Sequence, residues 1–278
     1  NPWRHLGGLA YFLFWIVAVT GIYIYVFFDT GVTQAYASLE YLSREQWYLG
    51  GVMRSLHRYA SDAMAFTMLL HMLRHFAFDR FRGFRWFSWL TGVALIWLVY
   101  VSGINGYMLP WDKMAQFVIT ASFEWLDRLP MFGGALMRNF IYASSVNDRF
   151  FSLLAFMHIG IPLVVLLLMW VHVQRVPKAR TNPSRPIMAG LLATLLVLSL
   201  LAPALSQGGA ADMAVAAGTL QFDWFYLSLM PLLYIWPLGR VWALVVAVTA
   251  LLLALPWIFF IDARGGRADL ASLRFAFT

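Results

Sequence analysis

The chain has 278 residues, of which 62% are hydrophobic, 17% aromatic and only 12% charged. A soluble domain carries about a quarter charged residues, so this composition excludes a protein with an entirely water-facing surface. The net charge of +7 does not indicate nucleic-acid binding, because basic residues that flank apolar spans orient membrane proteins. Without cysteine, the chain itself cannot hold a disulfide or an iron–sulfur cluster.

Six segments are predicted to cross the membrane, since about 20 mostly apolar residues span a bilayer as a helix. In chain order they are residues 9–28, 52–76, 86–109, 151–174, 186–205 and 240–261. We therefore predict an all-α polytopic membrane helix bundle that forms a single domain over residues 1–278. Residues 110–150, which mix aromatic and charged side chains, predict interfacial helices rather than a span.

The basic residues predict the orientation of this bundle. Both termini and the loops 74–85 and 175–185 form a first set of segments, which holds few acidic residues. The opposite side of the bundle holds more acidic than basic residues. The basic residues of the first set are Arg4, Arg74, Arg80, Arg82, Arg85, Arg175, Lys178, Arg180, Arg185, Arg264, Arg267 and Arg274. The positive-inside rule then places both termini in the cytoplasm or an equivalent negative compartment.

Two spans carry histidine pairs with the same spacing. His57 and His71 lie in the second span, His158 and His172 in the fourth, and each pair is separated by 14 residues. Fourteen helical steps return to within about 40° of the first side chain and about 21 Å along the axis. Adjacent helices would hold two stacked histidine pairs suited to haem iron, whereas packing histidines satisfied by carbonyl groups are the alternative. His75 lies one turn beyond His71, and the equal spacing favours His71.

Glycines repeat the same interval. Gly7 and Gly21 flank the first span, Gly92 and Gly106 do the same in the third, and each pair is again 14 residues apart. Glycine inside a helix costs about 1 kcal/mol relative to alanine, so a compensating use is expected. A flat macrocycle lying against the bare backbone at two levels would be such a use; close packing of helices is the other.

Two arginines accompany the histidines of the second span. Arg54 precedes His57 by one turn, and Arg74 follows His71 by three residues. A guanidinium at the rim of a haem can pair with a propionate. For Arg74 an ordinary positive-inside residue is the alternative.

These residues resemble cytochrome b of the quinol-oxidising cytochrome bc complexes over about residues 1–260. The segments that carry the resemblance are RSLHRYASDAMAFTMLLHMLR, GYMLPWDKM, VIT at 118–120, Asn182-Pro183, FDWFY at 222–226 and LGRVWALV at 238–245. The resemblance implies two non-covalent b-type haems, with His57 and His158 sharing the positive-side haem. His71 and His172 would share the negative-side haem. Residues 1–174 would form the dihaem four-helix core, and residues 175–278 would add two helices and a quinone-site-like loop.

The chain departs from the family pattern at several positions. The six predicted spans correspond to the first six of the family's eight helices. Phe222 and Phe225 replace the proline and tyrosine of a Pro-Glu-Trp-Tyr motif, and Asp112-Lys113 replaces Gly-Gln. The 175–185 loop lacks the histidine of the family's negative-side quinone site.

The candidate quinone site is formed by Asp223, Trp224, Phe225 and Tyr226. Oxidation of a quinol requires a proton acceptor near an electron acceptor. Asp223 is the candidate catalytic acceptor, since it is an isolated carboxylate among aromatic residues and burial would raise its pKa. A helix N-cap is the alternative role for this residue.

Three functions are compatible with these patterns. In the first, the chain is the electron-transfer subunit of a quinol:cytochrome c oxidoreductase in a bacterial cytoplasmic membrane, active only with iron–sulfur or cytochrome c-type subunits, and a homodimer is allowed. In the second, the same dihaem core is the quinone-linked membrane subunit of another respiratory oxidoreductase. The third is a membrane scaffold or transporter without redox activity.

Overall fold

The computed structural model describes residues 2–142, 146–176 and 179–258, and within these ranges the chain is helical without a strand. The long helices are α1 (Leu6–Phe27), α3 (Val52–Ala77), α4 (Trp86–Met108), α6 (Asp148–Gln174), α7 (Arg185–Leu201) and α9 (Leu238–Ile258). The shorter ones are α2 (Ala35–Arg44), α5 (Lys113–Leu126) and α8 (Met230–Ile235). Single turns are η1 (Pro2–His5), η2 (Trp47–Gly51), η3 (Gly83–Arg85) and η4 (Met137–Ile141).

The six long helices correspond to the six predicted spans. Those that meet the length and hydropathy expected of a membrane span are Pro2–Phe27, Gly83–Met108, Asp148–Gln174 and Leu238–Ile258. Helix α3 is equally long but carries several charged residues, and α7 is apolar but only 17 residues long. The predicted all-α polytopic membrane bundle is confirmed. Residues 259–261 of the sixth predicted span, Lys178 and the basic C-terminal tail lie outside the described residues.

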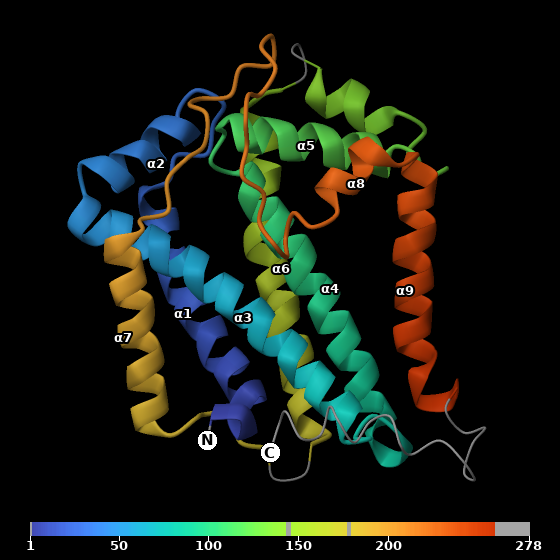
Figure 1. The fold of residues 1–278 in the computed structure, drawn as a ribbon. Helices are drawn as coiled ribbons and strands as arrows, with labels where there is room; N and C mark the ends of the chain where they lie inside the picture. Colours follow the sequence, from blue (N-terminus) through green and yellow to red (C-terminus); the bar gives the residue numbers. More distant parts are fainter. Residues whose placement is uncertain (1, 143–145, 177–178, 259–278) are drawn as a thin grey trace.

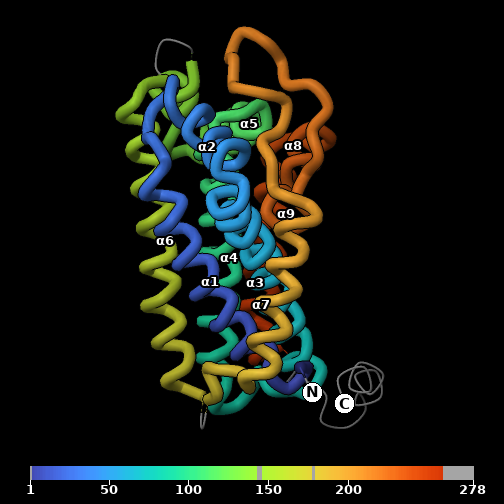
Figure 2. Tube along the Cα trace, turned by 90° about the vertical axis from the view of Figure 1, so that its left-hand side faces the viewer, coloured from blue at the N-terminus to red at the C-terminus, as the bar shows by residue number. Residues whose placement is uncertain are grey.

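Four helices form the centre of the bundle. Helix α1 packs along α3 and α4 packs along α6, while α3 also contacts α4. Figures 1 and 2 show these helices side by side along the long axis of the molecule. Helix α7 lies against α3 at one flank, and α9 lies against α4 at the other (Figure 1). The arrangement brings the histidine-bearing helices α3 and α6 together between the glycine-bearing helices α1 and α4.

Short helices cover one end of the bundle. Helices α2, α5 and α8 lie across the end at which α1 terminates and α3 begins (Figure 1). Helix α5 begins with a capped turn, because the Asp112 carboxylate accepts a hydrogen bond from the backbone N–H of Ala115 at 2.8 Å. The prediction that residues 110–150 form helices outside the spans agrees with α5 and η4.

The apolar core is divided along the bundle axis. A central cluster contains Leu13, Leu56, Met64, Val99 and Val165 from the four inner helices. A second cluster surrounds α5 at the covered end, and a third surrounds Phe81 and Trp89 at the other end. The central cluster therefore lies between two hollow regions of the bundle.

Candidate functional site

The cavity at the covered end of the bundle has a volume of 340 Å³ and is lined by His57 and His158 together with Gly21 and Gly106. The ring centroids of the two histidines are 6.1 Å apart. A bond between a metal and an imidazole nitrogen is about 2 Å long, so this separation leaves room for one metal atom bonded to both rings. The residues present fit a haem iron held between α3 and α6.

Backbone carbonyl groups fix the orientation of both imidazoles. His57 Nδ1 lies 3.0 Å from the carbonyl oxygen of Val17, and His158 Nδ1 lies 3.1 Å from that of Ser102. A carbonyl oxygen can only accept, so each Nδ1 carries the proton and donates it. The lone pair of Nε2 is then available to a metal, which is the arrangement that metal-ligating histidines usually adopt.

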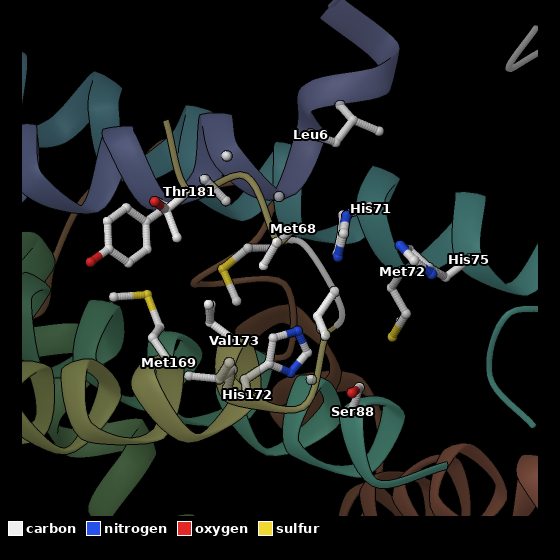
Figure 3. A pocket seen from close by; sticks show the side chains of 18 of the residues that line it. Leu6, Met68, His71, Met72, His75, Ser88, Met169, His172, Val173 and Thr181 are labelled. Atoms are coloured by element: carbon white, nitrogen blue, oxygen red, sulfur yellow. The ribbon is translucent and has the colours of Figure 1, made fainter. Parts of the chain in front are cut away.

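The second cavity, at the opposite end of the bundle, has a volume of 460 Å³ and is lined by His71 and His172. In Figure 3 both imidazoles point into this space, His71 from α3 and His172 from α6. His172 Nδ1 lies 2.8 Å from Thr91 Oγ1, and that hydroxyl donates to the carbonyl oxygen of Phe87 at 3.0 Å. The hydroxyl therefore accepts from His172 and leaves its Nε2 available, as in the first cavity.

The four predicted glycines each face one of the four histidines. A methyl group on Gly21 would lie 3.0 Å from His57 Cε1, and one on Gly106 would lie 2.8 Å from His158 Cε1. The equivalent distances are 2.9 Å for Gly7 with His71 and 3.6 Å for Gly92 with His172. At Gly21, Gly106 and Gly7 these distances are shorter than ordinary van der Waals contacts, so a side chain there would displace the imidazole, whereas the contact at Gly92 would be an ordinary one.

His75 and the two arginines lie at the edges of the cavities. The rings of His71 and His75 have centroids 4.5 Å apart, but it is His71 that contacts Gly7. Arg74 lines the larger cavity, and its Nε atom is buried without a hydrogen-bond partner among the described residues. Such an orphaned donor fits an anionic group in the cavity. Arg54 lines the smaller cavity and donates to the hydroxyls of Ser43 at 2.6 Å and Ser206 at 2.8 Å.

The candidate quinone segment lies in the loop between α7 and α8, close to the cavity at the covered end. Asp223 is completely shielded from solvent, and its Oδ2 accepts a 2.7 Å hydrogen bond from Arg58. The Tyr107 hydroxyl donates to the same oxygen at 3.3 Å. Oδ1 accepts from the backbone N–H groups of Phe225 and Tyr226. Asp223 therefore caps the turn that precedes α8, whereas the N-cap of α8 itself is Leu229, so Asp223 is not the helix N-cap of the alternative prediction.

The expected rise in the pKa of Asp223 is wrong. Burial raises the pKa of this carboxyl, but the Arg58 guanidinium and the two backbone N–H donors outweigh burial and hold the pKa below its usual range. The sequence prediction considered burial among aromatic residues and did not include a cation from another helix. Asp223 is thus an ionised group in a fixed ion pair.

The aromatic residues of this segment divide between the interior and the surface. Tyr226 is buried, and its hydroxyl donates to the carbonyl oxygen of Ser61 at 3.0 Å. Its ring lies where a side chain on Gly103 would be, only 2.0 Å from the position of a Cβ atom there. Trp224 is exposed and packs edge-on against Phe66 of α3, with ring centroids 6.2 Å apart.

Several residues of these sites were not singled out from the sequence. Arg58 and Asp62 contact the quinone segment, and Tyr107 contacts both Arg58 and Asp223. Thr20 and Thr91 lie beside His57 and His172. The signals were present: Arg58 and Asp62 form an i,i+4 pair inside a predicted span, and each threonine immediately precedes one of the glycines.

The fold and the two sites define a helical membrane protein that holds paired histidines at two levels of a four-helix core. Among the residues that the structure describes, no three His, Cys, Asp or Glu side chains gather as a metal-binding group, so these pairs are the candidate ligands. The family model for Cytochrome b/b6/petB matches residues 1–179, and the chain therefore belongs to the cytochrome b family. Membership of this family implies haem binding and electron transfer.

A solved structure described as a hyperthermophilic respiratory Complex III has the same fold. The TM-score is 0.76 at 17% sequence identity, and the match covers 92% of this chain and 75% of that chain. The fold similarity extends well beyond residue 179, so it includes the loop and helices that follow the four-helix core.

Proposed function

We propose that this chain is the dihaem cytochrome b subunit of a quinol-linked respiratory complex, passing electrons across the bilayer between quinol and partner redox subunits. The observation that carries the proposal is the pairing of four histidines in two cavities, each imidazole facing a glycine. Haem, when bound, supplies a one-electron carrier at each level. His57 and His158 would hold one haem and His71 and His172 the other.

The surroundings of each cavity support this assignment. The two histidine levels are separated by 14 residues of helix, which is about 21 Å and most of the hydrocarbon thickness. Arg74 offers an unpartnered donor to a propionate, and Arg54 lines the other cavity. The apolar core lies between the two cavities and separates the two sites.

For the quinone site we propose the segment Asp223–Tyr226 at the covered end, which we assign to the positive side. It contacts α3 at Arg58 and Ser61 and α4 at Tyr107. The structurally similar protein is described as a respiratory Complex III, which supports a place in a respiratory chain, and a bacterial cytoplasmic membrane is the location that we propose. Iron–sulfur and cytochrome c-type subunits are the proposed partners, and a homodimer is compatible with this arrangement.

The experiment is to purify the chain from its native membranes, identify the co-purifying subunits and add a reduced quinone analogue. We expect two b-type haems per chain, both reduced by the quinol. Reduction by dithionite but not by quinol would overturn the quinol-linked function. The absence of a haem spectrum would favour a non-redox scaffold. Partners other than iron–sulfur and cytochrome c-type subunits would favour the recruitment of this core to another oxidoreductase.

A further inference from the structure

A single guanidinium joins two carboxylates at the proposed quinone site. Arg58 Nη2 lies 2.7 Å from Asp223 Oδ2, and Arg58 Nη1 lies 3.0 Å from Asp62 Oδ1. Asp62 is on the same face of α3 as Arg58, one turn further into the membrane and between the levels of His57 and His71. An ionisable side chain at this depth of a span is costly and is rarely kept without a function.

The two carboxylates differ in how fully they are bound. Asp223 is 0% exposed, and both of its oxygens accept from fixed donors. Asp62 is 21% exposed, and Arg58 binds its Oδ1. Asp223 is therefore a fixed anion that holds Arg58, whereas Asp62 can gain or lose a proton at its second carboxylate oxygen.

Arg58 binds Asp62 Oδ1 and Asp223 Oδ2 through two nitrogens of the same guanidinium, so the two carboxyl groups are neighbours. The donors around Asp223 keep that group ionised, so a proton that reaches the pair is taken up by Asp62. Two adjacent carboxyl groups sharing one proton is an arrangement that suits proton exchange near neutral pH.

The surface around Asp62 fits a lipid-soluble aromatic substrate. Phe66 follows Asp62 by one helical turn and is 52% exposed, and Trp224, which packs against Phe66, is 51% exposed. Quinol is dissolved in the hydrocarbon of the bilayer and would meet these two rings beside a partly exposed carboxylate. Asp62 therefore combines a carboxylate that can accept a proton with a position that quinol can reach from the bilayer.

On these grounds we propose that Asp62 accepts a proton from quinol and that Asp223 is a positioning residue that holds Arg58 beside it. The inference rests on the proposed quinol-linked function. In this step a quinol O–H bond breaks, its electron pair stays on the quinol oxygen, and an O–H bond forms at Asp62. The two electrons of the quinol would leave separately to one-electron carriers, which a haem held by His57 and His158 and a partner redox subunit would supply.

The test compares three variants of the purified complex: Asp62→Asn, Asp62→Glu and Asp223→Asn, with Glu45→Gln as a control exposed at the same end of the bundle. The titratable or charged groups that face Asp62 are Arg58 on α3, Tyr107 on α4, and Asp223 and Tyr226 in the loop. The first readout is the rate of quinol-driven haem reduction against pH. The second is the infrared band of the protonated carboxyl group that forms when quinol is oxidised.

For Asp62→Asn we expect the rate to fall about 10²–10⁴-fold, the usual contribution of a general base. The fall of the rate on the acidic side of the pH profile should disappear, the protonated-carboxyl band should be lost, and both haems should remain reducible by dithionite. Asp62→Glu should restore most of the rate. Asp223→Asn should keep the band and the pH profile, and Glu45→Gln should match the wild type.

The failure of the proposed function and the failure of the inference about Asp62 give different results. If quinol does not reduce the wild-type haems, the proposed function is wrong, and the inferred role of Asp62 is wrong as well. If the wild type is reduced normally and Asp62→Asn retains its rate and pH profile, only the inference is overturned. Loss of the band and the pH profile in Asp223→Asn alone would make Asp223 the proton acceptor.

Discussion

Three of the four core histidines are oriented by a group that no histidine spacing reveals. The carbonyl oxygens of Val17 and Ser102 and the hydroxyl of Thr91 bind Nδ1 of His57, His158 and His172, respectively. The helix that supplies the glycine opposite each imidazole also supplies this acceptor, so α1 and α4 act as supports for ligands on α3 and α6. Glycine and acceptor together fix the ring and leave Nε2 for the metal.

Filling the space opposite one histidine should therefore remove one haem. In Gly106→Val the new side chain would begin 2.8 Å from His158 Cε1, and the ring would have to leave its position. We expect loss of the haem at the His57 level and retention of the other. Gly160→Val on α6 is the matched control, because a Cβ atom at Gly160 would meet nothing within 4 Å.

The haem content and the optical spectrum of the two purified variants measure this effect. Gly160→Val should contain both haems. Equal haem content in the Gly106→Val and Gly160→Val proteins would show that the contact with His158 has no importance for binding.

The positions of residues that repeat within a helix could be predicted from the sequence. Contacts between residues that are far apart in the chain could not. The 14-residue interval of His57 and His71 depends only on helix geometry, and it predicts their common face. Asp223 and Arg58 are 165 residues apart and lie on a loop and a helix, so no local pattern predicts their ion pair. Likewise, the space beside Gly103 that Tyr226 fills arises from the path of the loop.

At the scale of elements, α5 and the loop after α7 are held together by residues that depart from the family pattern. Asp112 Oδ2 accepts from the backbone N–H of Gln207 at 2.7 Å, while its Oδ1 caps α5. Lys113 Nζ donates to the carbonyl oxygens of Asp212 at 3.2 Å and Val215 at 3.1 Å. These bonds fix the loop that leads to Asp223 against the covered end of the bundle.

Replacing Asp112 should loosen this loop. In Asp112→Asn the amide has only one acceptor oxygen for two backbone donors, so one N–H is left facing an NH2 group. A buried donor without a partner costs about 1–3 kcal/mol. We expect a lower midpoint of thermal unfolding and faster proteolysis within residues 206–219.

Asp212→Asn is the control for this change. Asp212 is a carboxylate of the same loop, and among the described residues its side chain accepts only from the exposed N–H of Ala214 at 2.9 Å. Its replacement should leave the unfolding midpoint and the proteolysis rate nearly unchanged. Equal effects of the two substitutions would contradict the role of Asp112 as a link between α5 and the loop.

At the scale of the whole molecule, the alternation of the helices places the predicted cytoplasmic loops at one end. The turn at Gly83 and the segment before α7 lie at the end that holds the N-terminal helix turn η1 (Figure 1). Helix α2 and the loop after α7 lie at the other end. The helix bundle thus fits the division of basic residues that predicted the orientation.

Reporter fusions test that orientation in the membrane. Fusions after residues 83 and 182 should report the cytoplasm, because arginines flank both positions, while fusions near residues 38 and 212 should report the opposite side. Paired reporters, one active only in the cytoplasm and one active only outside it, provide the control at each position. Activity of one reporter at both 83 and 38 would be incompatible with the span formed by α3.

The central claim is that four histidines hold two haems in two specific pairs, and haem loss from single-histidine variants tests it most directly. The purified His57→Ala, His158→Ala, His71→Ala and His172→Ala proteins would each be titrated potentiometrically while their optical spectra are recorded. We predict that His57→Ala and His158→Ala lose the same haem, and that His71→Ala and His172→Ala lose the other. Loss of the same haem from His57→Ala and His172→Ala would contradict the account.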